Sequence, residues 1–219
     1  MNAEGIPGSW AAAVMVLALV QTPYAPQSAP TLPPVDEATH DATFVAFRDN
    51  LLRIVGRRDR TALIDLVDPG IQNTFGGDNG IDAFRRLWRL DAGDSPLWEV
   101  LQGVLSHGGT FDTPDWFVAP YVFSRWPDEF DAFDHVALVG DRVRIRALPA
   151  ADAGVLAILS RAILRRQEAP HNPDWTGVVL PDGRSGFVAS ALARGPTDYR
   201  AYFTRSNGRW RMVVLIAGD

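Results

Sequence analysis

Hydrophobic residues recur with helical spacing in the first half of the chain. The clearest series is Phe44, Phe47, Leu51 and Ile54. Its intervals of three, four and three residues predict an amphipathic helix over residues 42–55, and Gly56 is expected to end it. A short second helix is expected to begin after Asp59, whose side chain is a good N-cap, and to end at the DPG sequence of residues 68–70.

The stretch at residues 71–88 contains two glycines and then a third helical pattern. Asn79, followed three residues later by Asp82, resembles a capping box at the start of that helix. The oxygen ligands of Asp78, Asn79 and Asp82 raise the alternative of a calcium loop. Such a loop needs a regular ligand spacing and a final glutamate, and both are absent. Capping is therefore the favoured interpretation, and no metal site is predicted.

A fourth helix is predicted over residues 97–105, and an aromatic connector follows it at residues 110–131. Three prolines exclude a regular helix in the connector, which is expected to be irregular or partly extended. Its rings belong to Phe111, Trp116, Phe117, Tyr121, Phe123, Trp126 and Phe130. We expect them to fill the seam between the two halves of the chain; the alternative is an exposed aromatic shelf for sugar rings or a peptide.

The second half of the chain alternates with a period of two. Val143, Ile145 and Ala147 point to one face, while Arg142, Arg144 and Arg146 point to the other. An apolar stretch at residues 154–162 follows, and two strands are predicted at residues 175–180 and 185–189 around a PDGR turn. Short strands joined by tight glycine turns predict a small barrel.

Three motifs in this segment resemble the bacterial SH3-like (SH3b) domain family. VRIRALP at residues 143–149 is similar to the first strand of that family, and GVLAILSRA at residues 154–162 is similar to the second. The third motif, W-x-x-V followed by D-G-R-x-G-aromatic-V, is matched by Trp175, Val178, Asp182, Gly183, Arg184, Gly186, Phe187 and Val188. The resemblance covers about 60 of the 219 residues. It departs from the family at Ala147 and Leu148, where small polar residues are usual, and in a long basic stretch before Trp175.

The resemblance implies an extracytoplasmic accessory module that binds a peptide or a peptidoglycan fragment. It places aromatic residues at Trp175 and Phe187, and it places Arg144, Arg146 and Arg184 on an outer surface that could meet the carboxylates of a wall peptide. The residue types themselves favour a different interpretation, in which both rings fill the core of the barrel and the arginines are only solvated.

The last 22 residues predict a hairpin through the Asn207-Gly208 turn. The predicted fold class is α+β: an N-terminal helical half, a small SH3-like β-barrel and a C-terminal β-hairpin. The expected divisions are a signal-like segment with a Pro-rich linker (1–35), a helical domain with the aromatic connector (36–131), the barrel (132–194) and a hairpin that packs on the rest (195–219). In an alternative topology, the chain resembles the small cone-shaped α+β folds of the nuclear-transport-factor type, with the barrel as an insertion.

Residues 10–20 form an apolar run of 11 residues, which is too short to span a membrane but has the length of a signal-peptide core. The residues before this run include no arginine or lysine, and they include the acidic Glu4, so the basic N-terminal region of a signal peptide is missing. We expect an exported protein, periplasmic or secreted, with an uncleaved N-terminal membrane anchor as the alternative.

Composition excludes several functions. The chain has no cysteine, so disulfides, thiolate metal sites and cysteine nucleophiles are excluded. The four histidines, His40, His107, His135 and His171, have no zinc-hydrolase spacing, and no phosphate loop, dinucleotide fingerprint or serine elbow occurs. No cofactor, catalytic residue or nucleic-acid partner is therefore predicted, and the oligomeric state is left open.

The formal net charge of −5 is uneven along the chain. Residues 21–131 carry 9 arginines against 17 acidic residues, and residues 132–219 carry 12 against 8. This asymmetry is interpreted as docking between the two halves, ahead of an anionic ligand on the basic half.

Two hypotheses about function follow. The favoured one is an exported non-enzymatic binding or scaffolding protein whose SH3-like domain contacts a peptide or cell-wall fragment. The alternative is a cell-envelope hydrolase with a helical catalytic half, for which Glu99 and Asp115 are the candidate carboxylates. A pocket with two converging carboxylates, or a histidine beside a carboxylate, would favour the enzyme.

Overall fold

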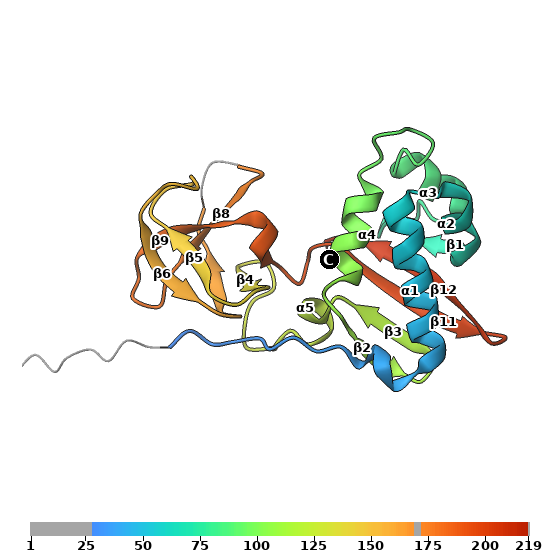
Figure 1. Ribbon diagram of the computed structural model, residues 1–219, viewed down its shortest axis with the longest axis horizontal. Coiled ribbons are helices and arrows are strands. Elements are labelled where there is room, and N and C mark those ends of the chain that lie inside the picture. The colour runs from blue at the N-terminus through green and yellow to red at the C-terminus, as the bar shows by residue number, and fades with distance from the viewer. Residues whose placement is uncertain (1–27, 169–171, 219) are drawn as a thin grey trace, which may run out of the picture.

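The computed structural model describes residues 28–168 and 172–218, and they form two units of unequal size (Figure 1). The apolar run at residues 10–20 lies outside the described residues. The fold class is α+β, as predicted. The chain passes between the units three times, at residues 28–36, 125–134 and 195–199. Residues 132–194 are therefore inserted between two parts of the larger unit.

The larger unit contains six helical segments and five strands. Its helices are η1 (Glu37–His40), α1 (Ala42–Arg57), α2 (Arg60–Leu66), α3 (Ile81–Leu87), α4 (Leu97–Leu105) and α5 (Tyr121–Ser124). Its strands are β1 (Val67–Gln72), β2 (Thr110–Thr113), β3 (Trp116–Ala119), β11 (Arg200–Ser206) and β12 (Arg209–Ile216).

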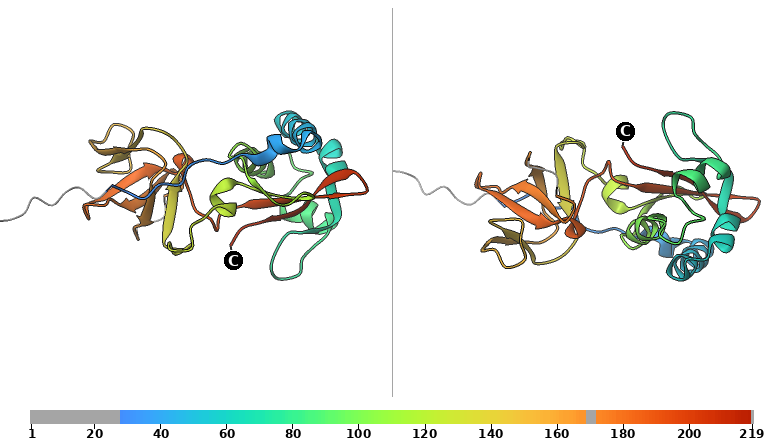
Figure 2. Two further views of the ribbon diagram at one scale, coloured as in Figure 1. Left: turned by 90° about the horizontal axis from the view of Figure 1, so that it is seen from below. Right: turned by 90° about the horizontal axis from the view of Figure 1, so that it is seen from above.

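The five strands form one sheet in the order β1-β12-β11-β3-β2, antiparallel except for the parallel pair β1 and β12. Helices α1 and α4 cover one face of this sheet (Figure 2). The expectation of a helical first half with a separate hairpin is thus corrected, because β11 and β12 lie at the centre of the sheet. The hairpin itself is confirmed, with Asn207 and Gly208 at φ 51° and 73°.

The core of the larger unit lies between the helices and the sheet. Phe44 of α1 is fully buried, and its ring centroid lies 4.1 Å from that of Phe117 and 5.7 Å from that of Phe203. Strict alternation along β12 would place Leu215 outside, but Leu215 is fully buried in this core. A β-bulge explains the difference. Neighbouring residues of β11 pair with Met212 and Val214, so the residue of β12 between these two has no partner on β11 and the alternation shifts by one position.

The predicted helix boundaries are correct in some places and wrong in others. The helix at residues 97–105 is confirmed as α4, and the Asp59 cap is confirmed, because Asp59 Oδ1 accepts from the Ala62 amide at 3.1 Å. Helix α1 does not end at Gly56 but continues to Arg57, and Arg58 in the left-handed region (φ 53°) ends it. The DPG sequence lies within β1.

The capping role predicted for Asn79 is wrong. The N-cap of α3 is Gly80, and Asn79 Oδ1 instead accepts from the Asn73 amide at 3.0 Å, which closes the loop before the helix. Asp78 pairs with Arg86 at 2.7 Å. Two of the three side chains of the conceivable calcium loop, those of Asp78 and Asn79, are therefore used in contacts with the protein itself.

The aromatic connector is more regular than predicted, because it supplies β2, β3 and α5. Its rings separate by the face on which they lie. Phe111 and Phe117 enter the core of the larger unit. Tyr121, Trp126 and Phe130 lie between the units. The ring centroids of Trp116 and Phe123 each lie 5.9 Å from the ring centroid of Tyr202. Only part of the series therefore fills a seam.

The smaller unit is built from strands. They are β4 (His135–Leu138), β5 (Val143–Arg146), β6 (Val155–Leu159), β7 (Ile163–Arg166), β8 (Trp175–Val179), β9 (Ser185–Ala189) and β10 (Ala193–Arg194), with the 3-10 helix η2 (Ser190–Leu192) before the last. The strand order is β10-β4-β7-β8-β9-β5-β6. The predicted closed barrel is not formed, since β10 has two residues, pairs with β4 and leaves β6 as the opposite edge.

Apolar contacts join the two units. Tyr121 and Val122 of α5 pack with Leu32, Ala137 and Ile163. The segment before η1 crosses the same boundary. Its Leu32 amide donates to the Arg161 carbonyl at 2.8 Å, and its Val35 carbonyl accepts from the Gly109 amide at 3.1 Å.

The acidic and basic halves of the chain do form ion pairs with each other: Arg205 pairs with Asp41 at 2.8 Å and with Asp115 at 2.6 Å. These pairs lie inside the larger unit, because β11 belongs to it. Arg166 of the smaller unit lies 3.9 Å from Asp198, in the segment that leads back to β11. The charge asymmetry also shrinks, because residues 132–194 contain 8 arginines against 6 acidic residues, while four arginines of the basic half belong to β11 and β12.

Candidate functional site

The outer face of the smaller unit begins with the alternation along β5. Val143 and Ile145 are buried in the apolar core, while Arg144 is exposed and Arg146 half-buried on the opposite face. The predicted strand is thus confirmed, although it stops at Arg146 and Ala147 is exposed.

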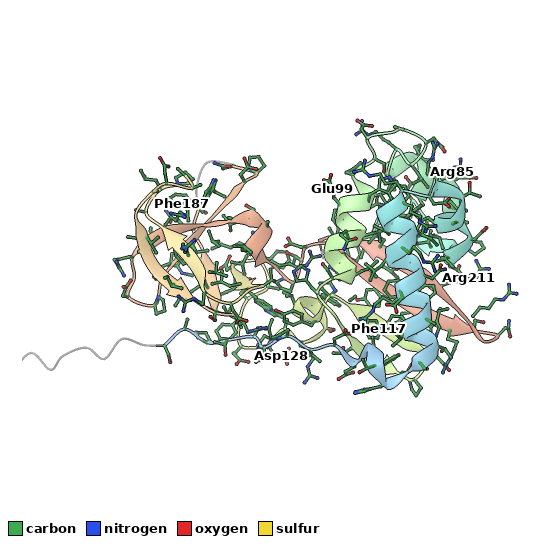
Figure 3. All side chains as sticks on the ribbon, in the orientation of Figure 1. Arg85, Glu99, Phe117, Asp128, Phe187 and Arg211 are labelled. Carbon is green, nitrogen blue, oxygen red and sulfur yellow. The ribbon has the colours of Figure 1, made fainter. Side chains whose placement is uncertain are left out.

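Strand register brings the candidate aromatic residues to the same face. Phe187 of β9 pairs with Arg146 on one side and with Gly177 of β8 on the other. Trp175 lies two residues before Gly177 on β8, so it lies on the same face as Phe187 and diagonal to it. We call the surface of Trp175, Phe187, Arg144 and Arg146 the Phe187 face. Figure 3 shows Phe187 on the smaller unit, distant from the larger one.

Neither aromatic ring belongs to the core. Both Trp175 and Phe187 are half-buried, and the core of the smaller unit is aliphatic. The neighbour of Phe187 gives the reason. A Cβ at Gly186 would lie 2.6 Å from Ile145 Cγ2, so the inward side at this point has no room even for a methyl group. The large ring must therefore lie outside.

The three candidate arginines differ in how they are engaged. Arg184 lies in the turn between β8 and β9, and its Nη2 pairs with Asp182 at 2.7 Å. The side-chain hydrogen bond from Arg184 lowers the pKa of Asp182 and raises that of Arg184. Arg146 Nη1 donates to the Ala153 carbonyl at 2.7 Å. Arg144 makes no hydrogen bond or ion pair with a described residue, so its guanidinium is free to meet a ligand. None of the three forms a hydrogen bond or an ion pair with residues 28–131 of the acidic half.

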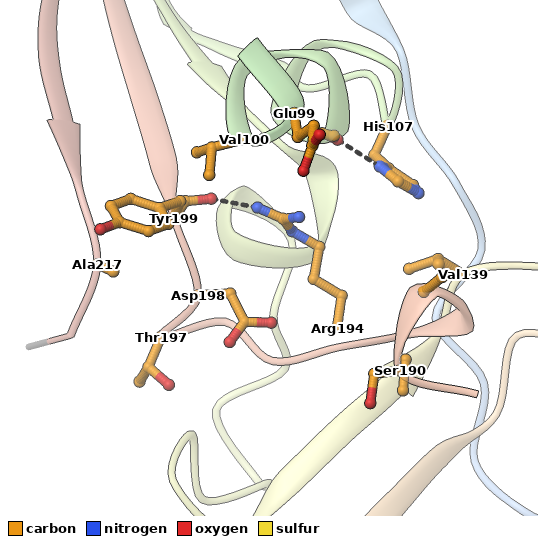
Figure 4. Close-up of a pocket in the computed structure, with 13 residues that line it drawn as sticks. Glu99, Val100, His107, Val139, Ser190, Arg194, Thr197, Asp198, Tyr199 and Ala217 are labelled. Carbon is orange, nitrogen blue, oxygen red and sulfur yellow. Dashed lines mark hydrogen bonds between the residues drawn. The ribbon is translucent and has the colours of Figure 1, made fainter. Parts of the chain in front are cut away.

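A cleft between the units has no counterpart in the sequence analysis. It has a volume of about 540 Å³ and lies between α4 on one side and η2 with residues 193–199 on the other (Figure 4). Arg194 extends into it, and Nη2 of this arginine donates to the Tyr199 carbonyl. Burial lowers the pKa of Arg194, against the opposing charge of Asp198.

His107 and two carboxylates, Glu99 and Asp198, line this cleft, but no hydrogen bond joins the histidine to either carboxylate. Nδ1 of His107 lies 2.5 Å from the Gly103 carbonyl and is engaged with the backbone. Glu99 is 85% exposed, with Arg58 at 4.0 Å. Asp115 pairs with Arg205 at 2.6 Å, on β11, and does not line the cleft. Within the described part of the chain, no histidine bonds to a carboxylate; His171 lies outside that part.

Two further features are absent from residues 28–168 and 172–218. No group of three or more His, Cys, Asp or Glu side chains is arranged to hold a metal ion. No helix there has the length and apolar character needed to cross a bilayer.

Comparison with known proteins gives no assignment: no protein-family model matches the chain, and no curated protein matches it significantly.

Proposed function

We propose that the protein is an exported, non-enzymatic binding protein whose smaller unit is an SH3-like domain that holds a peptide or a cell-wall peptide fragment on the Phe187 face. The three motifs similar to the SH3b family fall on β5, β6, β8 and β9 of that unit. The apolar run at residues 10–20 supports export. The partner is a peptide, and no cofactor takes part.

The observation that carries this proposal is the pairing of Phe187 with Arg146 on one side and Gly177 on the other. The glycine leaves the strand surface low beside a large ring, and an arginine flanks the ring. An extended peptide could lie across this step with its backbone against Trp175 and Phe187. A ligand carboxylate would then reach Arg144, whose guanidinium forms bidentate pairs with carboxylates.

A binding experiment with the full chain tests the proposal. The wild type is incubated with isolated peptidoglycan and, separately, with stem peptides in solution. The variants are Trp175→Ala, Phe187→Ala and Arg144→Ala. Each aromatic truncation is expected to weaken retention about 10-fold or more, and Arg144→Ala by less.

Matched controls are available on the same chain. Phe133→Ala removes another exposed ring (59% exposed), and Arg209→Ala removes an exposed strand arginine of the larger unit. Both controls should bind like the wild type. Equal retention of the wild type and all three Phe187-face variants would refute the proposed surface.

A further inference from the structure

We infer that the cleft between the two units is a second binding site, distinct from the Phe187 face, for a small molecule that carries a carboxylate beside an N–H donor, such as the end of a short peptide. Arg194 would hold the carboxylate, and Asp198 the donor. The inference does not depend on the function of the Phe187 face.

The first argument is the unmet hydrogen-bonding capacity of Arg194. A guanidinium has five N–H donors. Nη2 donates to the Tyr199 carbonyl, whereas Nε is buried without a partner among the described residues. No carboxylate in that part of the chain lies within 4.0 Å of this arginine. Arg194 is only partly exposed. A cation withdrawn from water is costly unless it is paired, so an anion in the cleft would complete its hydrogen bonding.

The second argument is the space opposite the guanidinium. Gly103 lies inside helix α4, where glycine is unfavourable by about 1 kcal/mol relative to alanine. Its φ is not in the left-handed region, so the backbone does not require glycine. A Cβ there would lie 3.8 Å from Arg194 Nη1. The wall of the cleft is therefore open beside the arginine, and only a side chain larger than that of alanine would fill this space.

The third argument is the charge of the remaining lining, which favours one class of anion. Asp198 Oδ2 accepts from the Gly195 amide at 2.8 Å, while Oδ1 is 3.9 Å from Arg166. Glu99 and Asp198 both line the cleft together with the partly buried Arg194 (Figure 4). Two carboxylates would repel phosphate, which carries more negative charge. A single carboxylate with a neighbouring ammonium or amide N–H matches both signs of charge.

Both units contribute to the walls, so an occupant would touch both. Gly103 and Glu99 come from α4 of the larger unit, and Ser190 from η2 of the smaller one. A ligand that binds the folded chain raises its apparent stability by mass action. Thermal unfolding is thus a second readout beside calorimetry.

The test uses the full chain and the dipeptide Ala-Ala as the probe, in isothermal titration calorimetry and thermal unfolding. Ala-Ala should bind saturably and raise the unfolding temperature. Its C-terminal amide, which lacks the carboxylate, and its N-acetyl form, which lacks the ammonium, should each bind at least about 10-fold more weakly. Inorganic phosphate should not compete.

Two variants assign the effect to the cleft. Arg194→Gln should weaken Ala-Ala binding about 30-fold or more. Gly103→Leu leaves Arg194 in place and fills the space, so it should also abolish binding. Gly103→Ala is the matched control, because a Cβ at 3.8 Å is an ordinary contact, and it should bind as the wild type does.

The inference is overturned if Ala-Ala gives neither heat nor a thermal shift at millimolar concentration. It is also overturned if Arg194→Gln and Gly103→Leu bind Ala-Ala as tightly as Gly103→Ala, or if phosphate displaces the dipeptide. The Phe187-face variants should leave Ala-Ala binding unchanged, which keeps the two sites distinguishable.

Discussion

Arg205 on β11 donates through Nη1 to Asp41 Oδ2 at 2.8 Å, a contact between residues 164 positions apart. Asp41 is also the N-cap of α1, and its Oδ1 accepts from the amides of Thr43 and Phe44 at 2.7 and 3.1 Å. One carboxylate therefore fixes both the start of the first long helix and its position against the C-terminal hairpin.

Replacement of Asp41 with alanine should remove the cap and leave Arg205 without this partner. We expect the free energy of unfolding to fall by about 1–2 kcal/mol in urea denaturation. Asp49→Ala is the control, since Asp49 is exposed on the same helix, and it should change stability by less than about 0.5 kcal/mol. Equal losses in the two variants would contradict the role of Asp41.

The same carboxyl group predicts a pH dependence. The hydrogen bond from the Thr43 hydroxyl, two backbone amides and the charge of Arg205 lower the pKa of Asp41 below its ordinary value of 3.8, against burial. A group with a depressed folded pKa stabilises the fold above the unfolded pKa, and this contribution is lost as the pH falls through the folded pKa. The stability difference between wild type and Asp41→Ala should thus be constant above about pH 5 and shrink below about pH 4. A difference independent of pH would argue against a charged cap.

Phe44 tests whether the hairpin belongs to the core of the larger unit. Phe44→Ala should cost about 3–5 kcal/mol, because a fully buried ring that contacts aromatic residues from β3, β11 and β12 is removed. Guanidinium denaturation measures the loss. The exposed Phe133 serves as the control, and its alanine variant should unfold like the wild type. A loss below about 1 kcal/mol for Phe44→Ala would show that the ring is not packed as described.

The turn between β11 and β12 should be destabilised by a Cβ at Gly208, its second residue. Gly208 has φ 73°, a conformation that costs L-residues about 1–2 kcal/mol. Gly208→Ala should lower the free energy of unfolding by that amount. Gly154→Ala is the comparison. Gly154 has no positive φ, and a Cβ at this position would have no neighbour within 4 Å. This substitution should therefore be neutral or slightly stabilising. A neutral Gly208→Ala variant would rule out the turn geometry.

Tyr121 reports on the contact between the units. Burial raises the pKa of this phenol above its ordinary value of 10.0. The negative charge of Asp141 also raises this pKa, whereas the positive charge of Arg161 lowers it. The raised folded pKa means that the stabilising contribution is present below about pH 10 and is lost as the pH rises from there through the folded pKa. Unfolding measured between pH 8 and 11 should show a steeper loss for the wild type than for Tyr121→Phe. Parallel pH profiles would mean that Tyr121 ionises as freely as in the unfolded chain.

Part of the candidate site was predictable because it depends on local patterning. Alternation along β5 separates Arg144 and Arg146 from Val143 and Ile145. The outward position of Trp175 and Phe187 was not predictable in this way, because large rings usually fill the core of a small domain and strand register decided the face. The pairing of Arg184 with Asp182 is also local, two residues apart in one turn, and the sequence could have indicated it. Arg194 could not be found in this way, because its surroundings come from α4 and from the return segment to β11.

The amino-acid sequence alone determined the elements whose causes are local: the helix at residues 97–105, the Asp59 cap, the Asn207-Gly208 turn and the strands at residues 143–146 and 185–189. Side-chain period, capping and turn chemistry act over a few residues, so each could be inferred without knowledge of the rest. Only the tertiary structure decided that β1, β2, β3, β11 and β12 form one sheet, although the smaller unit is inserted between β3 and β11 in the chain. It also decided that Asn79 closes a loop and that Arg194 lies partly buried in a cleft between two units. Those outcomes depend on contacts between distant segments, because the free energy of burying shared apolar surface selects which strands and helices meet.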